Sequence, residues 1–143
     1  MTQLIQPEEV PAVQGLMLVG ELPTCQIIDM WTTAKPTAQI LNGYTPTEAS
    51  VHASTNTTLR FNDPHNIGHA TACNLFLTVP GQIGKLAAVG AIGKLVISGH
   101  TVAQGYLDKL DLTAKAFGIN LPWMLEPMRY YRTGDLARYA LDR

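Results

Sequence analysis

Two short apolar runs separated by a helical pattern constrain the fold more than any other feature of the sequence. Residues 16–19 read L-M-L-V and residues 38–41 read A-Q-I-L, and each run has the length of a strand. Between them, residues 23–32 place apolar side chains at helical spacing, behind a proline that suits the first turn of a helix. Two strands joined by a helix are typical of a parallel sheet, because the chain must cross back before the second strand can run in the same direction. We therefore expect residues 15–42 to form a strand, helix, strand unit.

The sequence after residue 48 predicts a different, antiparallel architecture. Residues 51–58 are rich in Ser, Thr and Val, and residues 74–79 and 94–98 are short apolar or alternating runs separated by Gly and Pro, as in small β-barrels. Residues 111–117 indicate a short helix that Gly118 would stop, and residues 129–139 indicate strand, turn, strand. An α/β piece followed by a small barrel is the architecture that we expect.

Composition and charge exclude several classes of protein. With 143 residues, 46% of them hydrophobic and 15% charged, the chain is globular rather than disordered. A net charge of -1 provides no basic surface for nucleic acid or for an anionic membrane. The N-terminus has no signal-peptide pattern, and no apolar segment approaches membrane-spanning length. We expect a cytoplasmic protein without nucleic-acid or membrane partners.

The stretch L-N-G-Y-T-P-T-E-A-S-V-H-A-S from Leu41 to Ser54 is the strongest candidate for a functional site. Its Gly and Pro residues predict that the strand ends in a loop at about Asn42, and ligands bind at the carboxyl ends of strands in open α/β sheets. Tyr44 offers an aromatic face to a flat base, and Glu48 offers a carboxylate beside hydroxyls, which suits magnesium bridged to phosphates. From these residues alone, an ordinary turn with a solvated glutamate is the favoured interpretation.

Four motifs in one order resemble those of the amino-acid adenylation domains of nonribosomal peptide synthetases. N-G-Y-T-P-T-E from Asn42 is similar to the family's N-x-Y-G-P-T-E, and Y-R-T-G-D-L from Tyr131 matches another family motif. G-K-L-V-I-S-G-H-T-V-A-Q-G-Y-L from Gly93 resembles G-E-L-x-I-x-G-x-x-V-A-R-G-Y-L, and L-V-G-E-L from Leu18 resembles the L-x-G-G-E-x-L strand and turn. The departures are Thr45 and Val19 in place of Gly, Lys94 in place of Glu, and Gln104 in place of Arg.

The resemblance implies the fold class and a division into domains. It implies an α/β chain from the C-terminal part of an adenylation core, with a strand-helix-strand piece of a flavodoxin-like parallel sheet followed by a small β-barrel subdomain. Residues 1–58 would end the flavodoxin-like subdomain and carry the substrate-pocket and ATP loop, and residues 59–143 would form the barrel subdomain. The chain would end at residues 140–143, where a hinge leads to a C-terminal lobe. The phosphate loop, the substrate aspartate and the catalytic lysine would lie outside it.

The resemblance also implies the roles of individual residues. Thr47 and Glu48 would be catalytic, Thr47 on the side of the α-phosphate and Glu48 holding Mg²⁺. The nucleotide would be bound by Asn42, Gly43, Tyr44, Tyr131 and Asp135, with Tyr44 against the adenine and Asp135 on the ribose hydroxyls. The amino-acid pocket would be lined by Met17, Val19, Gly43, Val51 and His52.

The implied function is amino-acid activation for secondary metabolism. An AMP-forming ligase would use ATP and Mg²⁺ to make an aminoacyl-AMP and pass it to the phosphopantetheine thiol of a peptidyl carrier domain. The implied partners are the amino-acid substrate, the remainder of the adenylation domain and the carrier domain of the parent synthetase, and we expect the isolated chain to be inactive. Two alternatives stay open: another adenylate-forming ligase of the acyl-CoA synthetase or fatty acyl-AMP ligase type, and a non-catalytic module that binds nucleotide or a partner.

Overall fold

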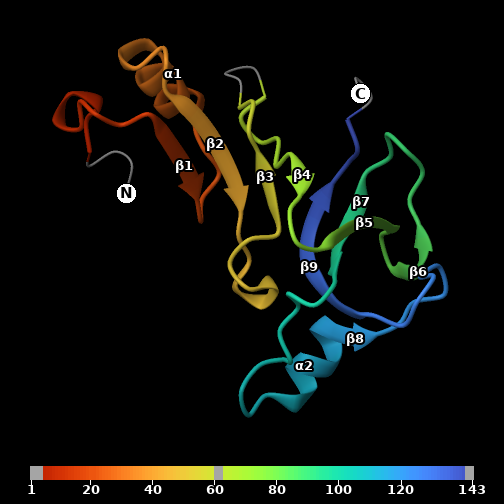
Figure 1. Ribbon diagram of the computed structural model, residues 1–143. Coiled ribbons are helices and arrows are strands. Elements are labelled where there is room, and N and C mark those ends of the chain that lie inside the picture. Colours follow the sequence, from red (N-terminus) through yellow and green to blue (C-terminus); the bar gives the residue numbers. More distant parts are fainter. Residues whose placement is uncertain (1–4, 60–62, 141–143) are drawn as a thin grey trace. The chain divides into compact units, whose positions relative to one another are not determined.

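Residues 5–59 and 63–140 are described by the computed structural model, and they form two compact units (Figure 1). Unit 1 consists of Met1–Thr45 and Ser54–Thr71, and unit 2 consists of Pro46–Ala53 and Ala72–Arg143. The chain therefore leaves unit 1 for a short segment and returns to it. The boundary predicted between residues 58 and 59 would separate the flavodoxin-like subdomain from the barrel subdomain, and it stays a prediction. Residues 141–143 of the predicted hinge lie outside the described residues.

Unit 1 contains a mixed sheet whose first two strands are parallel. Its strands are β1 (Gly15–Val19), β2 (Gln39–Tyr44), β3 (Ser54–Asn56) and β4 (His69–Ala70), in that order across the sheet. Helix α1 (Cys25–Ala34) connects β1 to β2, and a 3₁₀ turn, η1 (Pro7–Glu9), precedes β1. Because β1 and β2 pair in parallel, the expected strand, helix, strand unit is confirmed.

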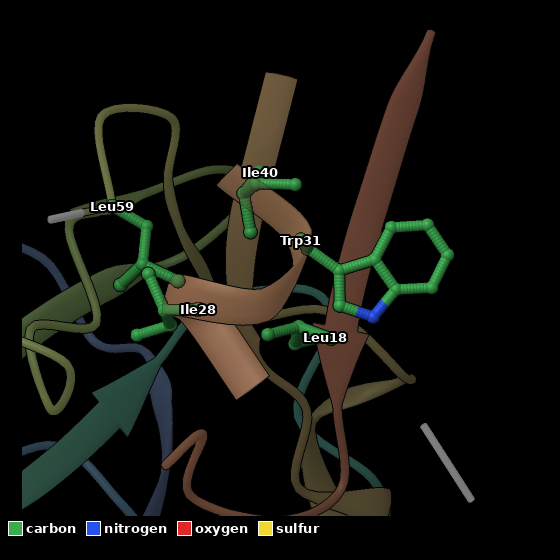
Figure 2. Close-up of a cluster of buried hydrophobic side chains, with 5 residues drawn as sticks. All are labelled: Leu18, Ile28, Trp31, Ile40 and Leu59. Atoms are coloured by element: carbon green, nitrogen blue, oxygen red, sulfur yellow. The ribbon is translucent and has the colours of Figure 1, made fainter. Parts of the chain in front are cut away.

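Helix α1 starts at a threonine cap and buries one face against the sheet. The Thr24 side chain accepts a hydrogen bond at 3.3 Å from the amide three residues on, so the helix begins at Cys25 and the predicted proline lies before its first turn. Ile28 and Trp31 are 1% and 2% exposed, and they belong to the cluster shown in Figure 2. Its members are Leu18, Ile28, Trp31, Ile40 and Leu59. Burial of these side chains holds the helix on β1 and β2.

Strand β2 continues further than predicted. The loop expected at about Asn42 begins only after Tyr44, because the last three residues of β2 pair antiparallel with β3. Asn42 lies opposite Asn56 in this pairing and is 3% exposed. The partner strand comes after an intervening turn, so no local pattern in β2 reveals it.

Unit 2 contains a five-stranded antiparallel sheet that curls (Figure 1). Its strands are β5 (Asn74–Val79), β6 (Gln82–Leu86), β7 (Gly93–Ser98), β8 (Phe117–Ile119) and β9 (Arg129–Ala137), in the order β6-β5-β7-β9-β8. The 3₁₀ turn η2 (Thr47–Ala49) and helix α2 (Leu110–Ala116) complete the unit. The two sheets confirm the predicted fold class. No helix in the described part of the chain is long and apolar enough to cross a membrane.

Three local predictions for the chain after residue 48 were wrong, each for a physical reason. Ser54–Asn56 is antiparallel as expected, but it pairs with β2 rather than with the barrel-like sheet. Helix α2 ends before Gly118, which lies in β8 opposite Tyr130, where a Cβ would come 2.3 Å from the Tyr130 hydroxyl. Residues 129–137 form one strand, because pairing with β7 carries the backbone across the expected turn.

Candidate functional site

The predicted site residues divide between the two units. Unit 1 holds Met17, Val19, Asn42, Gly43 and Tyr44, and unit 2 holds Thr47, Glu48, Val51, His52, Tyr131 and Asp135. Within each unit the structure brings some of these residues together on neighbouring elements. The two groups differ in how their side chains are held.

Asn42 occupies a buried position in β2 and has a part in the fold itself. Its side-chain amide donates to the Asn66 carbonyl at 3.0 Å, and the Asn56 amide donates to the same carbonyl at 3.1 Å. A carbonyl oxygen has two lone pairs, so one acceptor can satisfy both donors. The two side chains thereby fasten the loop at residue 66 to the paired strands β2 and β3.

Met17 and Val19 lie on the face of β1 that is turned away from helix α1. Side chains alternate along a strand, and Leu18 between them is buried in the cluster with α1. Met17 and Val19 are 42% and 51% exposed, and Val19 lies opposite Gly43 on β2. Three of the predicted pocket residues therefore lie on two adjacent strands. Tyr44, at the end of β2, is half-buried.

Glu48 lies on the single turn η2 and is held by residues far along the chain. The Tyr106 hydroxyl donates to Glu48 Oε1 at 2.7 Å, and the Glu48 carbonyl accepts from the Ala103 amide at 2.8 Å. The Ser50 hydroxyl adds a third contact by donating to the Thr101 carbonyl at 2.7 Å. These bonds fix the turn that carries Glu48 on the segment from residue 101 to residue 106.

A row of packed aromatic rings joins Tyr106 to Tyr131 in unit 2. The ring centroids of Tyr106 and Phe117 are 5.4 Å apart, and those of Phe117 and Tyr131 are 5.0 Å apart. The Arg129 guanidinium lies 5.6 Å from the Phe117 centroid, and Tyr131 is 7% exposed. Such edge-on and tilted ring pairs contribute to a defined packing. Tyr131 was among the predicted residues, whereas Tyr106 was missed, although the G-Y-L ending of the third motif was its signal.

Hydrogen bonds keep Glu48 ionised. Burial raises the pKa of its carboxyl, but hydrogen bonds from Tyr106, from its own backbone amide and from Tyr131 together lower the pKa below its ordinary value. Desolvation and the hydrogen bond with Tyr106 raise the pKa of Tyr131, and the hydrogen bond to Glu48 raises the pKa of Tyr106. At neutral pH the cluster therefore consists of one negative charge beside two neutral phenols.

Asp135 lies on a bulge of β9 rather than in a turn between two strands. The pairing register between β7 and β9 shifts next to Lys94, so residues 133–135 face Leu95 alone. The Thr133 hydroxyl donates to the Leu95 carbonyl at 3.1 Å and accepts from the Asp135 amide at 3.0 Å. A bulge redirects the side chains next to it, and the Asp135 side chain is exposed here.

The other predicted residues follow one another between β2 and β3. Thr47 is the exposed first residue of η2, Val51 is 74% exposed and His52 is half-buried. Ser50 and Val51 have φ values of 51° and 74°, a left-handed conformation that is rare for a β-branched side chain. Backbone outliers of this kind cluster at functional sites, which gives a physical reason to test Val51 and His52.

A sequence model of the family described as AMP-binding enzyme matches residues 2–107. Nonribosomal peptide synthetase GRA1 of Gibberella zeae is 38% identical over 144 residues, and nonribosomal peptide synthase roqA of Penicillium rubens is 39% identical over 147 residues. These alignments cover 96% and 99% of this chain but only 2% and 6% of the two relatives. The chain therefore spans a small part of the length of the curated relatives that it matches.

The fold is also similar to that of a solved structure, PA1221, an NRPS protein containing adenylation and PCP domains. The TM-score is 0.79 at 27% sequence identity, and the match covers 96% of this chain and 28% of that one. The similarity thus extends over nearly the whole chain in fold as well as in sequence.

Proposed function

The chain belongs to the family of AMP-binding enzymes, and from this premise we propose that it is part of an adenylation domain of a nonribosomal peptide synthetase. Such a domain joins an amino acid to the α-phosphate of ATP and releases pyrophosphate. The resemblance drawn from the four motifs is confirmed by the peptide-synthetase relatives at 38% and 39% identity. The parent would be an AMP-forming ligase to which this chain contributes parts of the nucleotide and substrate sites.

The observation that carries this proposal is the cluster of Glu48, Tyr106 and Tyr131. Adenylate formation depends on positioning and charge neutralisation more than on covalent help from the protein. A carboxylate kept ionised by phenol hydrogen bonds, on a turn fastened to a distant segment, is suited to that task. Thr47 precedes Glu48 on the exposed start of the same turn and would contact the α-phosphate.

Each unit has further residues that are proposed to contact the nucleotide. Asp135 is exposed on its bulge, and an ionised carboxylate can accept two hydrogen bonds from the ribose diol. Tyr44 would lie against the adenine, with Gly43 and Asn42 beside it on β2 and Tyr131 near the base. One side-chain N–H of Asn42 already donates to the Asn66 carbonyl. Its second N–H and its side-chain oxygen are the groups that Asn42 would offer to the base.

Magnesium fits the donor chemistry of Glu48. Mg²⁺ is commonly held by one or two carboxylates together with water and substrate phosphates. Glu48 supplies one ionised carboxylate, and among the residues that the structure describes no group of three or more His, Cys, Asp or Glu side chains could hold a metal ion by itself. When bound, Mg²⁺ would neutralise charge on the phosphates. Glu48 would hold the ion, and Thr47 would contact the α-phosphate.

The amino-acid pocket would take its apolar lining from Met17, Val19, Gly43 and Val51, with His52 as the polar member. Met17 and Val19 already present exposed apolar surface on one face of β1. The aminoacyl group would pass from the adenylate to a carrier-domain phosphopantetheine thiol with release of AMP, by analogy with the adenylation and PCP domains that PA1221 contains. A cytoplasmic location is part of the same proposal.

Titration of the ¹⁵N-labelled 143-residue chain with ATP and Mg²⁺ tests the nucleotide site. We expect the amide signals that shift to cluster at residues 42–48 and 131–135, since these segments carry the proposed contacts. Asp135→Ala and Tyr44→Ala should abolish the response, whereas Asp111→Ala, an exposed aspartate on α2, serves as the matched control and should leave it intact. A well-dispersed spectrum that ATP leaves unchanged would contradict the proposal and favour a non-catalytic interaction module.

A further inference from the structure

The peptide group that joins Gly134 to Asp135 is hydrogen-bonded at both of its ends. Its carbonyl oxygen accepts from the Lys94 ammonium at 2.5 Å, and its N–H donates to the Thr133 hydroxyl at 3.0 Å. The same Thr133 hydroxyl donates to the Leu95 carbonyl of the neighbouring strand. Because both ends are fixed, the orientation of this peptide plane is fixed, and with it the direction in which Asp135 leaves the backbone.

The backbone at Gly134 has open space where a side chain would be. Gly134 has a φ of 85°, and a Cβ built on it would meet nothing within 4 Å. A cavity of about 270 Å³ borders the bulge, with Gly134, Lys94 and Arg132 in its lining. The orientation of this peptide plane is set by ψ of Gly134 and φ of Asp135, and glycine restricts its own backbone dihedrals less than any other residue. The two hydrogen bonds therefore contribute to selecting one orientation.

Lys94 is placed to make that selection. It lies on β7 next to the register shift, is half-buried, and reaches the Gly134 carbonyl across the bulge. A charged donor makes a stronger hydrogen bond than a neutral one. The adenylation motif that this segment resembles has Glu at this position, and a carboxylate could not donate to a carbonyl. The hydrogen bond to the Gly134 carbonyl therefore depends on the lysine that this chain has at position 94.

We propose that Lys94 is a positioning residue that locks the Gly134–Asp135 peptide and thereby aims the Asp135 carboxylate at the nucleotide ribose. The proposal rests on the proposed function only in assigning the ribose to Asp135. Without the ammonium, the peptide divides its population between two orientations, and only one of them directs Asp135 correctly. The apparent dissociation constant of a ligand rises as the fraction of the binding-competent conformation falls.

The first test needs no nucleotide. In the full 143-residue chain, Lys94→Met keeps most of the methylene stem and removes the donor, and Lys85→Met makes the same change at an exposed lysine on β6. We expect Lys94→Met to shift the Gly134 and Asp135 amide signals and to speed hydrogen exchange of the Asp135 amide about tenfold, for an unlocked fraction that rises from about one tenth in the wild-type chain to about nine tenths in the variant. Lys85→Met should leave both unchanged, and Lys94→Arg, which retains a donor, should restore them.

The second test compares ATP with 2′,3′-dideoxy-ATP, which lacks the ribose diol. Lys94→Met should weaken the binding of ATP about tenfold and leave the binding of the dideoxy analogue unchanged, for the same change in the unlocked fraction. The double variant Lys94→Met with Asp135→Ala should bind ATP no more weakly than Asp135→Ala alone, because the two substitutions act on the same interaction between Asp135 and the ribose.

The outcomes separate the positioning role from the proposed function. If Lys94→Met behaves like Lys85→Met in hydrogen exchange and in ATP binding, the positioning role is overturned. If the wild-type chain binds ATP and the dideoxy analogue equally well, the ribose assignment of Asp135 fails and the proposal falls with it. Faster exchange in Lys94→Met would in that case still establish the lock on the peptide.

Discussion

Unit 1 and unit 2 hold their proposed binding residues in different ways. In unit 1, Asn42 and Gly43 belong to a strand paired on both sides, so the sheet ladder itself fixes their backbone. In unit 2, Glu48 lies on one 3₁₀ turn, and its carboxylate is held by a hydroxyl that is 58 residues away in sequence. A ladder distributes its support over many bonds, whereas the Glu48 carboxylate depends on a few side-chain bonds. Single substitutions in unit 2 should therefore change the orientation of a binding side chain, whereas single substitutions in unit 1 should mainly lower the free energy of unfolding.

The largest effect is expected from removing core volume in unit 1. Ile28→Ala should lower the free energy of unfolding of unit 1 by about 2–5 kcal/mol, because a buried side chain is lost and a cavity remains. Denaturant unfolding followed by residue-resolved amide signals measures this loss in each unit. Signals of β5 to β9 should persist after those of β1 to β4 have disappeared. Simultaneous loss of both sets would break the comparison, because the two units would then share one unfolding transition.

A matched pair of glycines with positive φ sharpens the comparison at the next level. At Gly68 in unit 1, a Cβ would come 2.0 Å from the Thr55 carbonyl oxygen, so Gly68→Ala should cost about 3 kcal/mol or more through combined clash and strain. At Gly134 in unit 2 the space is open, and Gly134→Ala should cost only about 1–2 kcal/mol, the penalty of a left-handed backbone. Thermal unfolding of the two variants ranks them, and equal losses would contradict the distinction.

The smallest effect on stability is expected from Tyr106→Phe, although it bears most directly on the site. The variant loses the hydroxyl that donates to Glu48, so the pKa of the Glu48 carboxyl should rise toward its ordinary value. A lowered pKa contributes stability above the ordinary pKa of the carboxyl and loses it as the pH falls through the lowered value. The variant should therefore be less stable by about 1 kcal/mol or less at pH 7, and equal to wild type in strong acid.

Side-chain NMR titration of Glu48 in both proteins checks this prediction. Tyr139→Phe is a suitable control, because its hydroxyl donates to the Leu75 carbonyl at 3.4 Å and to no carboxylate. An unchanged Glu48 pKa in Tyr106→Phe would show that Tyr131 and the backbone suffice to hold the charge.

Elements with local causes could be predicted from the sequence. The apolar run at residues 16–19 became β1, and the helical spacing before residue 32 became α1, because each pattern carries its own burial signal. The last residues of β2, the strand at Phe117–Ile119 and the continuous strand at Arg129–Ala137 could not be predicted, because each depends on a partner remote in sequence. Pairing across such separations overrides local turn signals.

The candidate site divides along the same line. The motifs singled out Glu48 and Tyr131, and the structure places both in one hydrogen-bonded cluster. Tyr106 completes that cluster, but nothing near Glu48 in sequence points to it. Two further hydrogen bonds could not be predicted from the sequence either: the one from Asn42 to the Asn66 carbonyl and the one from Lys94 to the Gly134 carbonyl. Each joins a side chain to a carbonyl that is distant in sequence.

The return of the chain to unit 1 has a consequence for how proteins of this kind diversify. Tyr44 and Ser54 are paired neighbours on β2 and β3, so residues 46–53 form a cassette with both ends anchored on the same sheet. That cassette carries Glu48 together with Val51 and His52. Recombination between related genes at the two anchors would exchange the carboxylate proposed to bind magnesium and two residues proposed to contact the substrate as one inheritable block.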